Sequence, residues 1–281
     1  MPGAGQRCIV IFIGCLLLFS QTASASDSKR EADFADEIAK THALGKLLWL
    51  EAKGKKFLGL YTETEKRINK GTIIILHDMG GHPNQLRLIK SLRTFLPQHH
   101  WSTLSLQMPL WEMDATEAEY YVLFPEAAAR IKAGVDYLKA HNNETLILVG
   151  YGLGAMMAVY ALSQQTPDIT AVALVSLAAP GNPNPQAQML EFIQKITIPM
   201  LDIYAERDQA AVVAAARDKR VAAKKNPAYQ QIKISDEDHL FQHDEGLVVK
   251  RIYSWIERTV ANQNDKDQRP VNINGPMPQQ P

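Results

Sequence analysis

The sequence has little cysteine, no excess of either charge, and no apolar run long enough to cross a membrane. Its two cysteines, Cys8 and Cys15, lie near the N-terminus, so the rest of the chain can form no disulfide and no cysteine–metal site. The 30 basic and 30 acidic residues balance, which argues against nucleic acid or an anionic membrane surface as the main partner. With 281 residues, 46% of them hydrophobic, the chain can form one large domain with a full core.

The N-terminus has the pattern of a secretory signal peptide. Arg7 precedes an apolar run over 8–19, and small residues follow up to Ala25. The run is shorter than the roughly 18 residues that a transmembrane helix needs, so we expect cleavage after Ala25 and no stable membrane anchor. Lipid attachment at Cys15 is disfavoured because the apolar run continues beyond it. We therefore predict a signal peptide at 1–25 and a periplasmic or secreted mature protein.

Composition divides the rest of the chain into three parts. Residues 26–44 are charged and form an N-terminal segment of helical or loose character. Residues 45–261 carry the apolar periodicity of a folded domain. Residues 262–281 are polar and rich in Asn, Gln and Pro. Such a segment cannot bury enough apolar surface to offset its ordering entropy, so we predict a disordered tail.

Apolar β-forming runs alternate with helical patterns after residue 70. GTIIILHD (71–78) and ETLILVG (144–150) are continuous apolar runs, typical of strands that are buried on both faces. The alternation indicates βαβ units, which predicts an α/β fold with a mainly parallel sheet and helices on both faces. Ligands of such folds bind beyond the carboxyl ends of the strands.

The stretch LILVGYGLGAMM (146–157) has the shape of a nucleophile elbow without its nucleophile. In many hydrolases a strand, a sharp turn and a helix of this pattern carry G-x-S-x-G, with serine at the centre. Gly152 has the central position here. Because glycine reaches the strained backbone conformation of an elbow at little steric cost, the turn is expected to persist while the hydroxyl is lost.

Two later loops supply an acid and a base in the order that α/β-hydrolases use. Asp208 follows the strand in IPMLDIYAERD, and His239 follows the last strand in ISDEDHLF. We expect Asp208 and His239 to be hydrogen-bonded, with Gly152 facing the same cleft. ILHDMGGHP resembles the loop that donates an oxyanion-hole N–H. The candidate oxyanion and pocket residues are Asp78, Met79, Gly80, Tyr151 and Leu153.

The combination of LHDMGGHP, WSTLSLQMP, VGYGLGA and DEDHLF, over roughly 45–261, resembles one particular group of proteins. It is a bacterial family of exported α/β-hydrolase-like proteins that is classed as a domain of unknown function. The resemblance implies an α/β-hydrolase-like fold and a periplasmic address, and it implies no established substrate. The connection over 179–198 is short, so we expect no large lid.

Other chemistries have weaker support. His77, Asp78 and His82 could suggest a metal, but no second cluster at ligand spacing accompanies them, so we expect no metal and no cofactor. Residues 150–155 also fit the dinucleotide-binding pattern G-x-G-x-x-A. The next strand, however, lacks the acidic residue that binds the ribose in such folds. Ser176 ends a strand without an elbow and is interpreted as a buried, hydrogen-bonded serine.

Two classes of function remain open. A triad without its serine keeps only a residual rate of order 10³–10⁴ over water. We therefore expect a non-catalytic protein, a pseudoenzyme that binds a small-molecule ligand or an envelope protein. The alternative is an ester or amide hydrolase that uses activated water or a non-standard nucleophile. Gly152 favours the first class.

Overall fold

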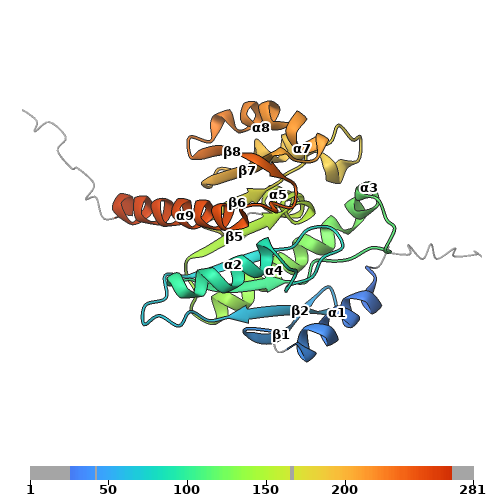
Figure 1. Ribbon diagram of the computed structural model, residues 1–281, viewed down its shortest axis with the longest axis vertical. Coiled ribbons are helices and arrows are strands. Elements are labelled where there is room, and N and C mark those ends of the chain that lie inside the picture. Colours follow the sequence, from blue (N-terminus) through green and yellow to red (C-terminus); the bar gives the residue numbers. More distant parts are fainter. Residues whose placement is uncertain (1–25, 42, 165–167, 268–281) are drawn as a thin grey trace, which may run out of the picture.

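The computed structural model describes residues 26–41, 43–164 and 168–267, with side chains up to 261. One eight-stranded sheet crosses this part of the chain, in the order β1-β2-β4-β3-β5-β6-β7-β8 (Figure 1). The strands are β1 (Lys46–Ala52), β2 (Lys55–Thr62), β3 (Thr72–Leu76), β4 (Ser102–Leu106), β5 (Leu146–Tyr151), β6 (Ala171–Val175), β7 (Met200–Arg207) and β8 (Tyr229–Asp238).

The sheet is mainly parallel, as the alternating pattern predicts. β1 and β2 form an antiparallel hairpin, β2 also pairs antiparallel with β4, and every later pairing is parallel. β3, β5 and β6 are buried along their whole length. This burial explains why their sequences are continuous apolar runs, since helices cover both faces of a parallel sheet.

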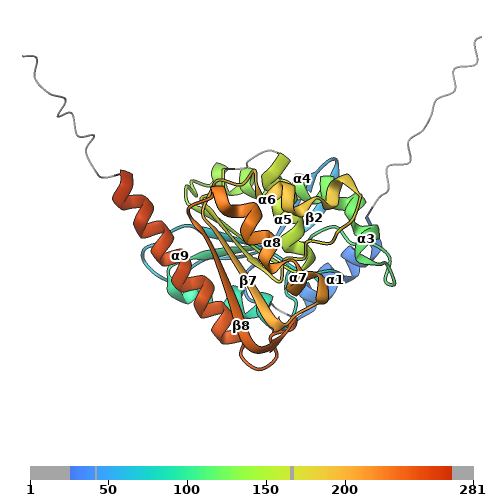
Figure 2. The ribbon, with the colours of Figure 1, turned by 90° about the horizontal axis from the view of Figure 1, so that it is seen from above.

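Helices lie on both sides of the sheet (Figure 2). Figure 2 shows α4, α5 and α6 on one side and α9 on the other, where α2 packs against α9. The α-helices are α1 (Ser28–Lys40), α2 (Leu88–Phe95), α3 (Glu117–Tyr120), α4 (Phe124–Ala140), α5 (Leu153–Gln164), α6 (Met189–Ile193), α7 (Ala210–Ala214), α8 (Ala216–Ala222) and α9 (Glu245–Asp267). The short 3₁₀ helices are η1 (Leu96–His99), η2 (Tyr121–Leu123), η3 (Pro185–Ala187) and η4 (Ala223–Lys225).

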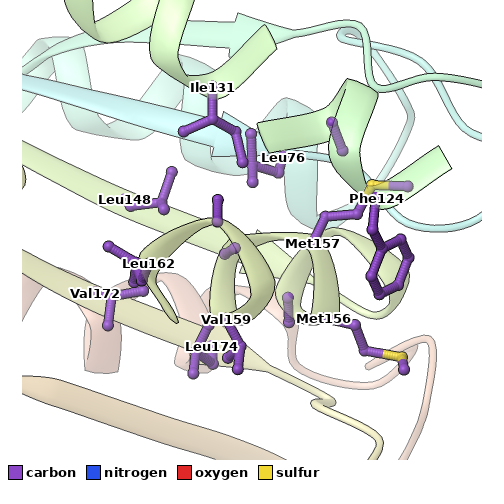
Figure 3. Packing of buried hydrophobic residues seen from close by; sticks show 14 of the residues in the cluster. Leu76, Phe124, Ile131, Leu148, Met156, Met157, Val159, Leu162, Val172 and Leu174 are labelled. Atoms are coloured by element: carbon purple, nitrogen blue, oxygen red, sulfur yellow. The ribbon is translucent and has the colours of Figure 1, made fainter. Parts of the chain in front are cut away.

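The larger of the two main core clusters lies between the sheet and the helices α4 and α5. Figure 3 shows Val159 of α5 beside Leu174 of β6, and Met156 and Leu148 belong to the same cluster. Nearly every residue of α5 is buried, so this helix is held firmly at the end of β5. A second cluster joins α2 and α9 to the opposite face of the sheet. The turn between β5 and α5 is therefore fixed by the core on both sides.

One predicted boundary needs correction, and the N-terminal segment 26–44 is helical. Its helix α1 packs Ala35 and Ile38 against Leu58 and Leu60 of β2. Helix α9 continues to Asp267, so the helix includes the beginning of the tail predicted at 262–281. Residues 268–281 and the predicted signal peptide at 1–25 lie outside the described residues. None of the helices in the described part of the chain is long and apolar enough to cross a membrane.

Candidate functional site

The turn between β5 and α5 has the geometry of a nucleophile elbow. Gly152 adopts φ +54° directly before α5 begins at Leu153. That left-handed conformation is open to glycine at little cost. A Cβ on Gly154 would collide with the backbone carbonyl oxygens of Leu76 and His77, so a second glycine lets α5 approach the end of β3. The shape of the elbow is thus maintained without the serine.

The place beside Gly152 is not vacant, which corrects the prediction of an empty nucleophile position. The Asp78 carboxylate lies there, and a Cβ built on Gly152 would overlap it. Its Oδ1 accepts the backbone N–H of Met79 and that of Leu153, each at 2.7 Å. Met79 and Leu153 are two of the five residues that the sequence suggests for the oxyanion hole and pocket. Their N–H groups bind a carboxylate of the protein itself.

His239 joins this carboxylate to the acid loop. Its Nε2 is 2.8 Å from Oδ2 of Asp78, and its Nδ1 is 2.8 Å from Oδ1 of Asp208. The hydrogen bond between Asp208 and His239 that chain order predicts is thus present. The Tyr151 ring stacks on the imidazole, with 5.3 Å between ring centroids, and its hydroxyl donates to the His239 carbonyl oxygen at 2.9 Å. The two carboxylates therefore fix the ring nitrogens of His239, and Tyr151 covers one face of the ring.

Asp208 is fully buried and accepts hydrogen bonds from several directions. Ser176 Oγ donates to its Oδ2 at 2.6 Å, and the backbone N–H groups of Ala205 and Gln209 donate at 3.0 and 2.9 Å. Burial of the Asp208 carboxyl opposes ionisation. The bonds from His239, Ser176 and the backbone outweigh that effect and lower its pKa. Asp208 therefore carries a stable negative charge beside His239.

The two carboxylates keep His239 protonated at neutral pH. Burial of the imidazole disfavours its charged form. The hydrogen bonds and charges of Asp208 and Asp78 more than offset this and raise the pKa of His239 to about 9. The site thus contains an imidazolium between two carboxylates, where a triad has a neutral base beside a hydroxyl. An imidazolium cannot take a proton from a nucleophile, so His239 in this state does not serve as a general base.

The loop that carries Asp78 is fixed by a buried histidine. His77 Nε2 accepts the backbone N–H of Met108 at 2.9 Å, and Nδ1 lies 2.7 Å from the Asp78 carbonyl oxygen. Burial lowers the pKa of His77 to about 4. A neutral imidazole that accepts at Nε2 donates at Nδ1, so His77 orients the loop. The described residues include no group of His, Cys, Asp and Glu that could hold a metal ion.

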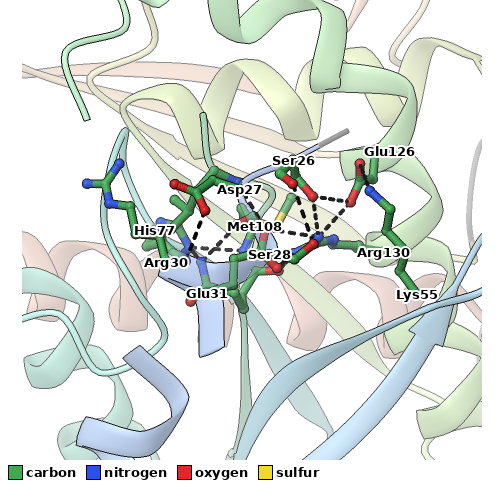
Figure 4. A network of polar contacts seen from close by, with 12 residues as sticks. Ser26, Asp27, Ser28, Arg30, Glu31, Lys55, His77, Met108, Glu126 and Arg130 are labelled. Atoms are coloured by element: carbon green, nitrogen blue, oxygen red, sulfur yellow. Dashed lines mark hydrogen bonds and ion pairs between the residues drawn. The ribbon is translucent and has the colours of Figure 1, made fainter. Parts of the chain in front are cut away.

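Helix α1 also reaches this loop. The Arg30 guanidinium donates to the carbonyl oxygens of Gly80 and Trp111 at 3.2 and 3.1 Å. The sequence analysis placed Gly80 near the pocket. In the structure its carbonyl oxygen accepts a hydrogen bond from Arg30. Figure 4 shows the buried Arg130, which pairs with Glu31 of α1 and with Glu126, on the other side of this network from Arg30. The N-terminal segment is thus in contact with the loop that fills the oxyanion hole.

Sequence reasoning placed Asp78 in the pocket but missed what its side chain does there. β3 and β5 are adjacent, with Leu76 opposite Gly150. Asp78 lies two residues after Leu76, and Gly152 lies two residues after Gly150, so the chain continues from both strands to the same place. The sequence does show a glycine at position 152 and a carboxylate at position 78. Connecting these two residues requires knowing that β3 and β5 are neighbouring strands. Ser176 was expected to be buried and hydrogen-bonded, and its bond to Asp208 extends the site by one residue.

One cavity in the described part of the chain lies away from this site. It measures about 640 Å³ and opens between α4 and α5, with Lys132, Tyr160 and Asp168 in its lining. A second cavity of about 340 Å³ adjoins α8. Neither is lined by Asp78, Asp208 or His239, so the chemical argument rests on the hydrogen-bonded site and not on cavity size.

Solved structures with this fold include esterases. Est1E from Butyrivibrio proteoclasticus is 17% identical with a TM-score of 0.61, over 77% of this chain and 100% of that one. The Pyrococcus furiosus esterase Pf2001 is 16% identical with a TM-score of 0.65, over 79% and 93%. XC6422 from Xanthomonas campestris, an α/β serine hydrolase without a lid, is 13% identical with a TM-score of 0.59, over 76% and 94%. At such identities the likeness establishes the α/β-hydrolase-like fold alone.

A sequence comparison with curated proteins gives no match. A family model described as "Protein of unknown function (DUF3530)" matches residues 10–129 and 114–258, which together span most of the chain. Because this match covers more than half of the chain, the chain belongs to the DUF3530 family, and its mainly parallel sheet and its likeness to the solved structures give it an α/β-hydrolase-like fold.

Proposed function

We propose that this protein does not act as a serine hydrolase and that it functions by binding a small-molecule ligand or an envelope protein. One observation carries the proposal. The Asp78 carboxylate fills the space beside Gly152 and accepts both oxyanion-hole N–H groups. Acyl transfer by a serine needs a hydroxyl at the elbow and an open pair of donors for the developing oxyanion. The site has neither.

A fluorophosphonate probe tests this function directly. Such a probe reacts with a hydroxyl that a neutral histidine activates, and His239 is held protonated beside two carboxylates. We expect no labelling of the wild-type protein and no turnover of a panel of short-chain and aromatic esters, with a serine esterase as positive control. Labelling of the wild type at any serine would overturn the proposal. Ser176, the hydroxyl bonded to Asp208, would be examined first by peptide mapping.

The alternative is an ester or amide hydrolase with Asp78 as a non-standard nucleophile. One observation favours it over activated water: Oδ1 of Asp78 already lies between two N–H donors, while Oδ2 faces His239. Attack by Oδ2 on an acyl carbon would form a mixed anhydride and break the bond to the alcohol or amine, which would leave with a proton from His239. Water that attacks the Asp78 carbonyl carbon of this anhydride would release the acid and regenerate the carboxylate, so turnover in ¹⁸O-labelled water would place ¹⁸O in Asp78. Hydrolysis with that label would establish the alternative in place of the binding function.

The envelope location is part of the same proposal. It is supported by the charged, apolar and small-residue order over 7–25. Ser26, the residue after the expected cut, is buried and donates to Glu126 at 3.0 Å, so a chain cut after Ala25 keeps this contact. Intact-mass analysis of the envelope fraction should give a chain that starts at Ser26. A chain that retains Cys8, or one lipidated at Cys15, would contradict cleavage at this place.

A further inference from the structure

Three hydrogen-bond donors of the site converge on one carboxylate. The N–H groups of Met79 and Leu153 bind one oxygen of Asp78, and Nε2 of His239 binds the other. Asp78 therefore has the position of a ligand that the chain supplies to itself. Resting on the binding function above, we propose that this site binds a carboxylate on an apolar body, which replaces the Asp78 side chain at these donors.

The charges of the site fit a ligand that carries a single negative charge. Asp208 is fully buried and balances one unit of charge on the imidazolium of His239. When Asp78 turns away, the two N–H donors and the outward Nε2 of His239 lose their partner. The Leu153 N–H also belongs to the N-terminus of α5, whose dipole favours an anion there. A carboxylate with two oxygens restores every lost hydrogen bond and leaves the total charge of the site unchanged.

The Asp78 side chain can leave without dismantling the site. Both N–H donors are backbone groups, so rotation of the Asp78 side chain about its own bonds leaves them in place. The side chain is already 17% exposed, so solvent reaches it. Gly152 has no side chain in the space beside it. A ligand carboxylate could therefore enter where Asp78 lies, in competition with Asp78.

The surroundings of the donors favour an apolar ligand body. Met79 follows Asp78 and Leu240 follows His239 in the chain, and these two large apolar side chains are 44% and 45% exposed. A single exposed apolar residue is ordinary on a protein surface. Here one such residue directly follows each member of the ion pair between Asp78 and His239 in the sequence. A short-chain fatty carboxylate would bury both while its head group binds the donors.

Calorimetric titration with octanoate tests the inference, with octanamide as the uncharged control and acetate as the control without an apolar body. We expect octanoate to bind the wild type weakly, because Asp78 competes for the donors. Asp78→Ala should bind octanoate at least about tenfold more tightly, since the competing state is removed. Acetate should bind more weakly than octanoate, and octanamide should not bind. The double variant Asp78→Ala/His239→Ala should lose the gain.

A measurement on the wild type keeps the test independent of whether Asp78→Ala folds. Octanoate should shift the NMR signals of the His239 imidazole in the wild type, and octanamide should not. Equal binding of octanoate and octanamide, binding that survives loss of His239, or no shift in the wild type up to saturation would each overturn the inference. Fluorophosphonate labelling would overturn only the proposed function, because octanoate has no scissile bond and reports on the donors alone.

Discussion

At the scale of single residues, the site is decided by two neighbours that fit each other. Gly152 offers a left-handed backbone turn and no side chain, and Asp78 places a carboxylate in the free space. Either change alone would leave a defect. A bulkier residue at 152 would collide with the carboxylate, and a small residue at 78 would leave the N–H groups of Met79 and Leu153 without this acceptor. The pair is therefore best understood as one unit.

The ionisation of His239 follows from this unit. We expect the wild-type imidazole to titrate near pH 9 by NMR, and Asp78→Asn to lower its pKa by removing one of the two carboxylates. The folded pKa lies above the ordinary value of 6.5. The resulting stabilisation is therefore complete below pH 6.5 and is lost as the pH rises through about 9. A wild-type imidazole that titrates near 6.5 would contradict the arrangement.

We expect that a reactive serine can be introduced at position 152 only by changing both residues. In Gly152→Ser the new Cβ would overlap Asp78, and holding a serine at φ +54° adds strain of about 1–3 kcal/mol. We expect this single variant to be destabilised and unlabelled by a fluorophosphonate. The double variant Asp78→Gly/Gly152→Ser should be labelled. Without the Asp78 side chain the serine hydroxyl has space, the two N–H donors are open, and His239 is neutral at high pH. Labelling that persists after His239→Ala would show that the reacting hydroxyl lies elsewhere.

At the scale of elements, helix α1 connects the N-terminal segment to the loop of Asp78. Arg30 of α1 donates to Gly80 on that loop and to Trp111 on the next one. Glu31 accepts from the N–H of Leu110 and pairs with the buried Arg130 (Figure 4). The loops at the carboxyl ends of β3 and β4 are thus attached to one helix that precedes the sheet in sequence.

Arg30 should limit the motion of the Asp78 loop. Removal of its guanidinium in Arg30→Ala leaves the Gly80 carbonyl oxygen without this donor. We expect faster hydrogen exchange at the Met79 and Leu153 amides, because the loop opens more often. Lys29→Ala is the matched control, since Lys29 lies on the same helix with an 87% exposed side chain. Equal exchange in both variants would show that α1 does not restrain the loop.

Arg130 should be essential to the attachment of α1. It is buried between Glu31 and Glu126, at 2.9 and 2.6 Å. Arg130→Ala would leave two carboxylates with little access to water, and we expect a loss of about 3–5 kcal/mol in unfolding free energy. Lys132→Ala on the same helix breaks an exposed i, i+4 pair with Asp136 and should cost no more than about 0.5 kcal/mol. Urea denaturation of both variants gives the comparison, and similar losses would contradict it.

At the scale of the whole molecule, the sheet joins two core clusters and α1 covers a third. Leu58 and Leu60 on β2 are buried beneath Ala35 and Ile38 of α1. The described chain from Ser26 onward is therefore one structural unit, although composition suggested a boundary at residue 45. The esterases with the same fold show that this scaffold accommodates hydrolytic sites, while function depends on the residues placed on it.

Removal of α1 should thus affect the entire domain. A chain that starts at residue 45 would expose Leu58 and Leu60 and leave Arg130 without Glu31. We expect it to be strongly destabilised or aggregated. The chain that starts at Ser26 should unfold in one cooperative transition, with coincident urea curves from circular dichroism and tryptophan fluorescence. A soluble truncated chain with unchanged stability would show that α1 is only an appendage.

The sequence alone determined the fold class, the elbow and the order of its partners. Apolar runs specify buried strands, and the positions just after them mark the sheet edge where Asp208 and His239 meet. These features are local, so they can be predicted from the pattern. Only the tertiary structure decided what lies beside Gly152. The register of β3 against β5 brings Asp78 there from a distant part of the chain, and strand neighbours are fixed by packing of the whole core.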